Sequence, residues 1–203
     1  MTRTPIEPGA LFDFQQYPVA TSDVLPQLVH EHQLGFVNRA VEASYRVRTY
    51  LHLDGDKLTA PHGKILEEQA HELTRYLLFV DEASLPEVGI GGDPAFKHDF
   101  LDGKRTDSQG RSLKDFDLRA RLFRYRCSYM IYSPLFQGLP GLLKAQVYEY
   151  LDEALSGRAP GFDHIPLAER NAIRSILEQT LPDLADGWSQ AVRAGGHSGS
   201  AKQ

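Results

Sequence analysis

Apolar residues between 25 and 50 recur at spacings of three and four, and this pattern limits the possible folds more than any other feature. The stripe consists of Leu25, Val29, His32, Phe36, Ala40, Ala43, Val47 and Tyr50. Such spacing places all of these residues on one face of an amphipathic helix. Similar stripes follow in later segments, and no series of alternating strands joined by hairpin turns is evident. The sequence therefore predicts an all-α fold.

Capping residues divide the chain into further helices. Prolines favour the first helical turn, Ser, Thr and Asp favour the position before it, and glycine favours the end. The predicted helices run from Ser22 to about Leu53, from Thr59 to Val80, from Asp93-Pro94 to Asp102-Gly103, from Pro140 to Gly157, from Pro166, and from Pro182 through Trp188.

Residues 113–132 are expected to form the central helix of a single-domain irregular helical bundle. Ser112 and Asp115 match the Ser-x-x-Asp capping box that often begins a helix. At 100° per residue the apolar side chains gather on two opposite faces, as they do in a helix packed between other elements. The first face comprises Phe116, Ala120, Phe123, Cys127 and Met130, and the second comprises Leu118, Leu122, Tyr125, Tyr129 and Tyr132.

Four arginines lie between these two faces, and each needs a partner where water is scarce. Asp115 with Arg119 and Asp117 with Arg121 have the favourable i,i+4 spacing. Partners for the other two arginines are expected from the acidic connection, with Asp81, Glu82 and Glu87 as candidates.

The alternative for the two remaining arginines is an anion site. Arg124, Arg126 and the hydroxyl of Tyr129 could hold a phosphate, a carboxylate or the propionates of a haem. No glycine-rich phosphate loop supports this hypothesis, since GIGGD at residues 89–93 is too short to match one.

Two histidines raise the hypothesis of a metal site. Glu68 and His71 form a Glu-x-x-His motif of the kind used in di-iron helical bundles, although such sites need a second copy and two further glutamates. The alternative is a solvated helix face. His32 lies on the apolar stripe, where it is either a hydrogen-bonded core histidine or a metal ligand or general base.

Length and composition bound the function. The chain has 203 residues, a net charge of -5 and no apolar run near the roughly 20 residues needed to cross a bilayer. An acidic chain is not expected to bind nucleic acid. Without a signal sequence it is expected in the cytoplasm, or in the periplasm if a leader was removed. We expect an extended arm at 1–20, a helical domain at 21–194 and a disordered tail at 195–203.

From about His32 to Trp188 the chain resembles the C-terminal region of a group of uncharacterised bacterial proteins. The resemblance rests on the runs RYLLFVDEASL, GDPAFKHDF and GRSLKDFDLRARLFRYRCSYMIYS. It implies a shared fold unit and transfers no catalytic residue. Related chains carry extra histidines near His32 where this chain has Gly35 and Val37, which weakens the metal hypothesis.

No catalytic motif of a known type is present, so the favoured function is a non-enzymatic interaction or scaffolding module that binds another protein. The competing hypothesis is a metal- or haem-binding helical bundle with a redox or electron-transfer role. It would use His32 or the face of Glu68 and His71, with Arg124 and Arg126 for propionates.

Overall fold

The computed structural model describes residues 23–55, 57–184 and 188, and within this part of the chain the fold is all-α, as predicted. The elements are α1 (Val24–Asp54), α2 (Ala60–Leu77), α3 (Pro94–Leu101), the 3-10 helix η2 (Tyr129–Tyr132), α4 (Pro134–Gln137), α5 (Gly141–Ser156) and α6 (Leu167–Thr180). No strand occurs among these residues, and the single isolated bridge joins Phe116 to Phe123.

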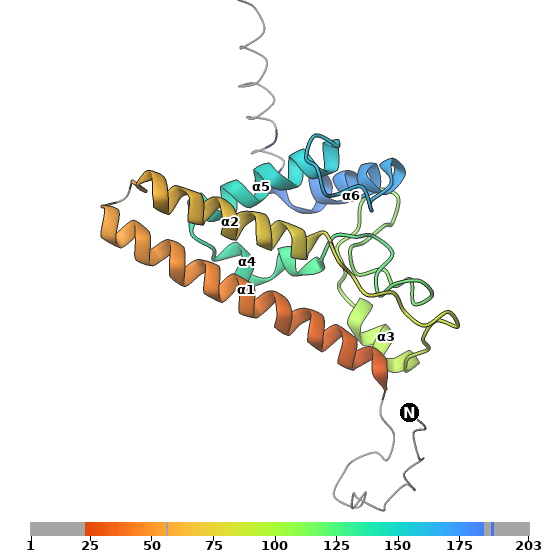
Figure 1. The fold of residues 1–203 in the computed structure, drawn as a ribbon. Coiled ribbons are helices and arrows are strands. Elements are labelled where there is room, and N and C mark those ends of the chain that lie inside the picture. The colour runs from red at the N-terminus through yellow and green to blue at the C-terminus, as the bar shows by residue number, and fades with distance from the viewer. Residues whose placement is uncertain (1–22, 56, 185–187, 189–203) are drawn as a thin grey trace, which may run out of the picture.

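Helix α2 occupies the middle of the bundle, between α1 on one side and α5 on the other (Figure 1). Helix α6 packs against α5, and α4 contacts α1. The short helix α3 lies beside the start of α1, and the irregular segments that follow α2 and α3 gather at the same end of the molecule (Figure 1). The backbone N–H of Asp93, just before α3, bonds to the Asp23 carboxylate at 2.5 Å. This end of the bundle is therefore built largely from loops.

The helix ends follow the capping signals of the sequence. Asp23 accepts a hydrogen bond from the backbone N–H of Leu25 at 3.0 Å, and Asp93 accepts one from Phe96 at 2.9 Å. Gly157 ends α5 with a φ of 77°, in the left-handed region that glycine adopts without a steric penalty. Ser22, the predicted first cap, lies outside the described residues.

The predicted stripe of α1 is buried over almost its whole length. Seven of its eight residues have no more than 9% of their surface exposed, and Tyr50 alone is half-buried. The predicted stripes of α2, α5 and α6 also face the core, with Leu73, Leu151 and Ile176 among their fully buried members. Apolar periodicity therefore identified the core positions of the long helices correctly.

The predicted central helix at residues 113–132 is wrong. The chain from 113 to 128 forms turns and bends, and only Tyr129–Tyr132 is helical, as a 3-10 turn. Leu118 has a φ of 62°, which an α-helix does not allow. Most of the segment's apolar side chains are nevertheless buried, including Leu122, Phe123 and Tyr125. The segment packs into the core as an irregular loop, and α2 holds the central position.

Polar side chains in this loop bond to the backbone groups that a helix would have used. Asp117 accepts hydrogen bonds from the backbone N–H groups of Arg119 and Ala120, both at 2.9 Å. Arg121 donates to the carbonyl oxygens of Phe123 and Arg124, at 2.9 and 2.7 Å. Such local bonds compete directly with helix formation. The predicted pair of Asp117 and Arg121 is therefore replaced by contacts with the main chain.

The Ser112 and Asp115 motif forms half of a capping box without a helix. The Asp115 carboxylate accepts from the backbone N–H of Ser112 at 2.9 Å, and the Ser112 hydroxyl accepts from Lys114 at 3.2 Å. A single turn closes here, with the Asp115 N–H bonded to the Ser112 carbonyl at 3.1 Å.

The predicted arm at 1–20 and the predicted tail at 195–203 lie outside the described residues.

Candidate functional site

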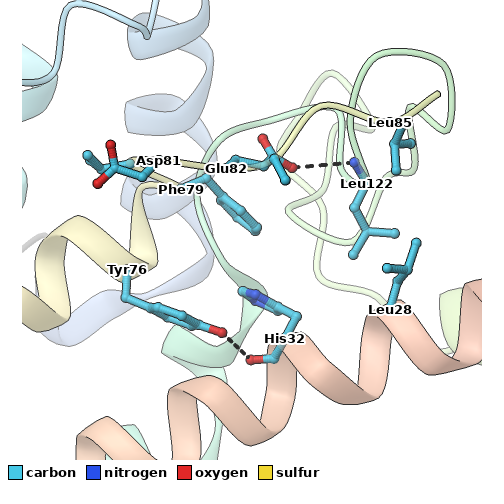
Figure 2. Close-up of a pocket in the computed structure, with 10 residues that line it drawn as sticks. Leu28, His32, Tyr76, Phe79, Asp81, Glu82, Leu85 and Leu122 are labelled. Atoms are coloured by element: carbon cyan, nitrogen blue, oxygen red, sulfur yellow. Dashed lines mark hydrogen bonds between the residues drawn. The ribbon is translucent and has the colours of Figure 1, made fainter. Parts of the chain in front are cut away.

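A cavity of about 240 Å³ opens between α1 and the segment that follows α2 (Figure 2). We call it the His32 pocket. It is lined by Leu28, His32, Tyr76, Phe79, Val80, Asp81, Glu82, Ala83, Leu85 and Leu122. Its walls are mostly apolar, and its polar groups are one imidazole, one phenol and two carboxylates. A concave apolar site with a few polar groups is typical of a binding site.

His32 is a buried histidine held by one strong hydrogen bond. Only 9% of its surface is exposed, and its Nε2 lies 2.6 Å from the Ser128 hydroxyl oxygen. That oxygen also accepts the backbone N–H of Met130 at 3.1 Å, which leaves the serine hydroxyl proton available for the imidazole. Burial lowers the pKa of His32 to about 4. The ring is therefore neutral at pH 7.

Aromatic rings fix the orientation of His32. The imidazole stacks on Phe79 with the ring centres 4.8 Å apart, and on Tyr76 at 5.5 Å. The Tyr76 hydroxyl donates to the backbone carbonyl of His32 at 2.9 Å (Figure 2). A Cβ atom at Gly35 would lie 2.2 Å from the Tyr76 hydroxyl oxygen. Glycine at position 35 therefore makes the room in which Tyr76 packs against α1.

The rim of the pocket has an unusual backbone. Phe79 and Asp81 have φ values of 55° and 65°, a left-handed conformation that is uncommon for residues other than glycine. Such conformations cost roughly 1–3 kcal/mol each and persist only where the surrounding structure holds them in place. The Asp81 carboxylate pairs with Arg75 at 2.6 Å, which ties the turn to the end of α2.

Glu82 brings a carboxyl group into this largely apolar site. Burial raises its pKa above the ordinary value, and the backbone N–H of Leu122 and the charges of Arg126 and Arg121 oppose that effect. Its oxygen lies 3.4 Å from the Leu122 N–H, across the pocket wall (Figure 2). Glu82 therefore supplies a hydrogen-bond acceptor with a negative charge at the rim.

The contact between His32 and Ser128 does not make a nucleophile and base pair. Ser128 is completely buried, and its hydroxyl oxygen accepts the Met130 N–H at the start of η2. Cys127 is also completely buried, and burial raises the pKa of its thiol. A buried thiol with a raised pKa is unreactive. Ser128 and Cys127 are therefore structural residues of the core.

The three predicted metal ligands do not converge. His32 lies in the core, whereas Glu68 and His71 are exposed residues of α2. The His71 ring packs edge-on against Tyr150, at 5.6 Å between ring centres, on the side of α2 that faces α5. No three His, Cys, Asp or Glu side chains of the described residues lie together as ligands would. His32 occupies the hydrogen-bonded core position that was one of its two interpretations.

The three residues of the predicted anion site are also separated by their contacts. Arg126 forms an ion pair with Glu169 at 2.8 Å, and Tyr129 accepts a hydrogen bond from Gln33 at 2.9 Å. Arg124 is exposed and has no carboxylate partner among the described residues. Its guanidinium lies 5.7 Å from the centre of the Tyr125 ring. Of these three residues, only Arg124 is therefore without a partner that would compete with an anion.

Glu169 on α6 is the residue that the sequence interpretation missed. It pairs with Arg126 at 2.8 Å and with Arg121 at 3.4 Å, and it accepts the backbone N–H of Arg126 at 2.7 Å. Of the partners predicted from the acidic connection, Asp81 pairs with Arg75, whereas Glu82 lines the pocket and lies close enough to Arg126 and Arg121 for their charges to lower its pKa against the larger effect of burial. An acidic residue in the first turn of α6 was visible in the sequence, but nothing in it indicated contact with residues 121–126.

Comparison of the chain with models of protein families, with curated proteins and with solved structures found no match. In the part of the chain that the structure describes, no helix combines the length and the apolar character needed to cross a membrane.

The buried His32 should make stability depend on pH. The unfolded chain takes up a proton near pH 6.5, but the folded chain does so only near pH 4. Between pH 4 and pH 6.5 the unfolded state binds more protons, so acidification destabilises the fold. The full contribution of neutral His32 to the free energy of unfolding is present above pH 6.5. The expected loss between these limits is about 3 kcal/mol. Urea unfolding at several pH values measures it.

His30 provides the matched control for this measurement, since it lies two residues away on the exposed side of α1. His32→Gln should flatten the dependence on pH, and His30→Gln should leave it unchanged. Glu82, whose pKa is raised, changes stability with pH in the opposite direction. It is present in both variants, so their difference isolates His32. Equal pH dependence in the two variants would contradict the assignment.

Proposed function

We propose that the protein is a non-enzymatic interaction module that binds a large apolar side chain of another protein in the His32 pocket. The observation that carries this proposal is the apolar cavity of about 240 Å³ with an acidic rim. Its volume falls below the roughly 300–1,000 Å³ typical of small-molecule pockets. Single aromatic or aliphatic anchors that fill such pockets supply much of the binding energy of protein interfaces.

The charges that line the pocket indicate which residues of the partner should lie next to its apolar side chain. The only charged side chains that line the pocket are the carboxylates of Asp81 and Glu82, and Asp81 is already paired with Arg75. Glu82 is half-buried, with a pKa raised by burial, so a cation or an N–H donor placed beside it would restore the interactions lost with water. We therefore expect a lysine or arginine next to the apolar anchor in the partner.

The segment at the rim can also bond to a partner through its main chain. Residues 82–86 have no regular secondary structure, and Ala83 and Ser84 are exposed. Their backbone N–H groups form no hydrogen bond with the described residues. Exposed backbone N–H groups that lack a partner can bond to the main chain of a bound peptide. An apolar anchor beside such a segment favours a peptide of a partner protein over a free small molecule.

A photo-crosslinking side chain at Ala83, expressed in the source cells, tests the proposal. The expected result is a cross-link to an apolar residue of another protein, with a lysine or arginine nearby in that partner, as mapped by mass spectrometry. The same group at Glu68, exposed on α2 away from the pocket, should not capture that protein. Leu28→Gln, inside the pocket, should abolish the cross-link, and Leu34→Gln, 43% exposed on the same helix, should not.

Two results would overturn the proposal. One is a cross-link that reaches only other residues of this chain or a second copy of it, because the pocket would then have an occupant of its own. The other is capture of the partner that persists in the Leu28→Gln variant, because the pocket would then not be the site of contact. The metal- or haem-binding alternative stays a prediction, and elemental analysis with an absorption spectrum of the isolated protein tests it.

A further inference from the structure

A second cavity, of about 260 Å³, lies between the loop that follows α3 and the 3-10 helix η2. We call it the Lys114 pocket. It is lined by Gly103, Lys104, Arg105, Ser112, Lys114, Tyr129, Met130, Tyr132 and Ser133. Three of these nine residues are cations, and none is an acid. The composition differs from that of the His32 pocket, whose charged groups are carboxylates.

Only one of the three cations in this pocket has a carboxylate partner among the described residues. Lys104 Nζ pairs with Asp115 at 2.6 Å. Lys114 Nζ donates to the backbone carbonyl of Phe100 at 2.8 Å, and Arg105 donates to the carbonyl of Thr180 at 3.1 Å. A carbonyl oxygen holds a cation in place but does not neutralise it. The pocket therefore carries two uncompensated positive charges.

Aromatic rings position these two cations. Lys114 Nζ lies 4.9 Å from the centre of the Phe100 ring and 5.9 Å from that of Tyr129. The Arg105 guanidinium lies 4.8 Å from the centre of the Tyr132 ring. Cation–π contacts stabilise a positive charge without removing its capacity to bind an anion. Both cations are thus held at the pocket wall before any ligand arrives.

Two serine hydroxyls add hydrogen-bond donors. Ser112 Oγ accepts the backbone N–H of Lys114 at 3.2 Å, and Ser133 Oγ accepts that of Phe136 at 3.2 Å. Neither hydroxyl donates to any described residue. A serine has one proton to give besides its acceptor sites. Both protons are therefore available to a ligand, and the serines are oriented by the bonds that they accept.

We propose that the Lys114 pocket binds the phosphate monoester group of a small organic molecule. A phosphate monoester carries close to two negative charges at neutral pH, which matches the two uncompensated cations. Its oxygens accept hydrogen bonds from Lys114, Arg105 and the two serines. The rings of Tyr129 and Tyr132 and the side chain of Met130 form the apolar part of the wall, against which the organic part of the ligand packs.

This proposal is independent of the proposed function. It places the anion site at a different location from the one expected from the sequence. The sequence placed an anion site at Arg124, Arg126 and Tyr129, but Arg126 is paired with Glu169. Tyr129 belongs to both sets and lines the Lys114 pocket. Lys104, Arg105 and Lys114 precede the four arginines of residues 119–126 in the chain. The tertiary fold brings these three cations to η2.

Titration with phenyl phosphate, followed by calorimetry and by amide chemical shifts, tests the proposal on the full chain. Lys114→Met removes one cation and keeps the length of the side chain, and it should weaken binding by about tenfold or more, as expected for a lost charge-assisted hydrogen bond. The control is Lys64→Met, at an exposed cation of α2, which should change the affinity by less than about twofold. Phenyl sulfate, with one charge less, should bind more weakly than phenyl phosphate.

Arg105→Met tests the same site if the Lys114 variant does not fold, and it should weaken binding by a similar factor. Shifts on binding should centre on residues 103–114 and 129–133. Equal affinities in the Lys114 and Lys64 variants would overturn the proposal, as would inorganic phosphate that binds as tightly as phenyl phosphate. A phosphoserine peptide that binds more tightly than phenyl phosphate would overturn the assignment to a small molecule.

Discussion

Replacing Phe123 with alanine is expected to lower the free energy of unfolding by about 3–5 kcal/mol. Phe123 is 1% exposed, and its ring meets more aromatic neighbours than that of any other described residue. Those neighbours are His32, Phe79, Phe100, Phe116 and Tyr129. Their distances from Phe123, between ring centres, run from 5.4 to 6.0 Å. Truncation would leave a cavity where the loop segments meet α1.

Phe96→Ala is the matched control for this prediction. Phe96 belongs to the same group of rings but is half-buried at its edge, where it stacks on Phe100 at 6.0 Å. Its truncation should cost less, about 1–2 kcal/mol, because less apolar surface returns to water. Urea unfolding followed by circular dichroism measures both variants. Similar losses for the two would show that Phe123 does not hold the loops to the helices.

The long helices could be predicted because their signals are local. The stripe of α1, the Asp93-Pro94 start of α3 and the Gly157 end of α5 each depend on residues within a few turns of one another. Periodicity and capping act at that range. The all-α class followed from these signals, and the structure confirms it.

The error at residues 113–132 has a physical cause that the sequence pattern conceals. Apolar residues at spacings of three and four can be buried whether the segment is a helix or an irregular loop. The pattern alone therefore does not distinguish the two. The decisive bonds are those of Asp117 and Arg121 to the main chain. Asp and Asn side chains often take backbone N–H groups in turns and so compete with helix formation. The capping motif at Ser112 indicated a turn correctly but not its continuation.

The candidate site was beyond prediction for a different reason. His32 was recognised as an unusual residue of an apolar stripe, but its partner Ser128 lies 96 residues away. The pocket also depends on positive φ angles at Phe79 and Asp81, and phenylalanine is a residue type that rarely adopts such a conformation. Tertiary contacts hold this geometry, so the periodicity of apolar residues in the sequence does not predict it. The same holds for the three cations of the Lys114 pocket.

Replacing Glu169 with alanine is expected to cost about 3–5 kcal/mol, because it removes the carboxylate that forms ion pairs with two largely buried arginines. The side chains of Glu169, Arg126 and Arg121 are 10%, 22% and 19% exposed, so water replaces the lost partner only in part. The variant also removes the acceptor of the Arg126 backbone N–H. Since Glu169 joins α6 to the arginine-rich loop, we expect the loop to loosen before the helices unfold.

Glu178→Ala on the same helix separates this effect from the loss of any acidic residue. Glu178 pairs with Arg174 at the i,i+4 spacing, and its side chain is 46% exposed, so its removal should cost less than about 1 kcal/mol. Denaturant unfolding gives the two free energies, and amide exchange of residues 113–128 reports on the loop. Glu169→Gln keeps an oxygen for the Arg126 N–H and should lie between the two. If Glu169→Ala costs no more than Glu178→Ala, the arginines do not depend on this carboxylate, and their charges must be met by water at the loop surface.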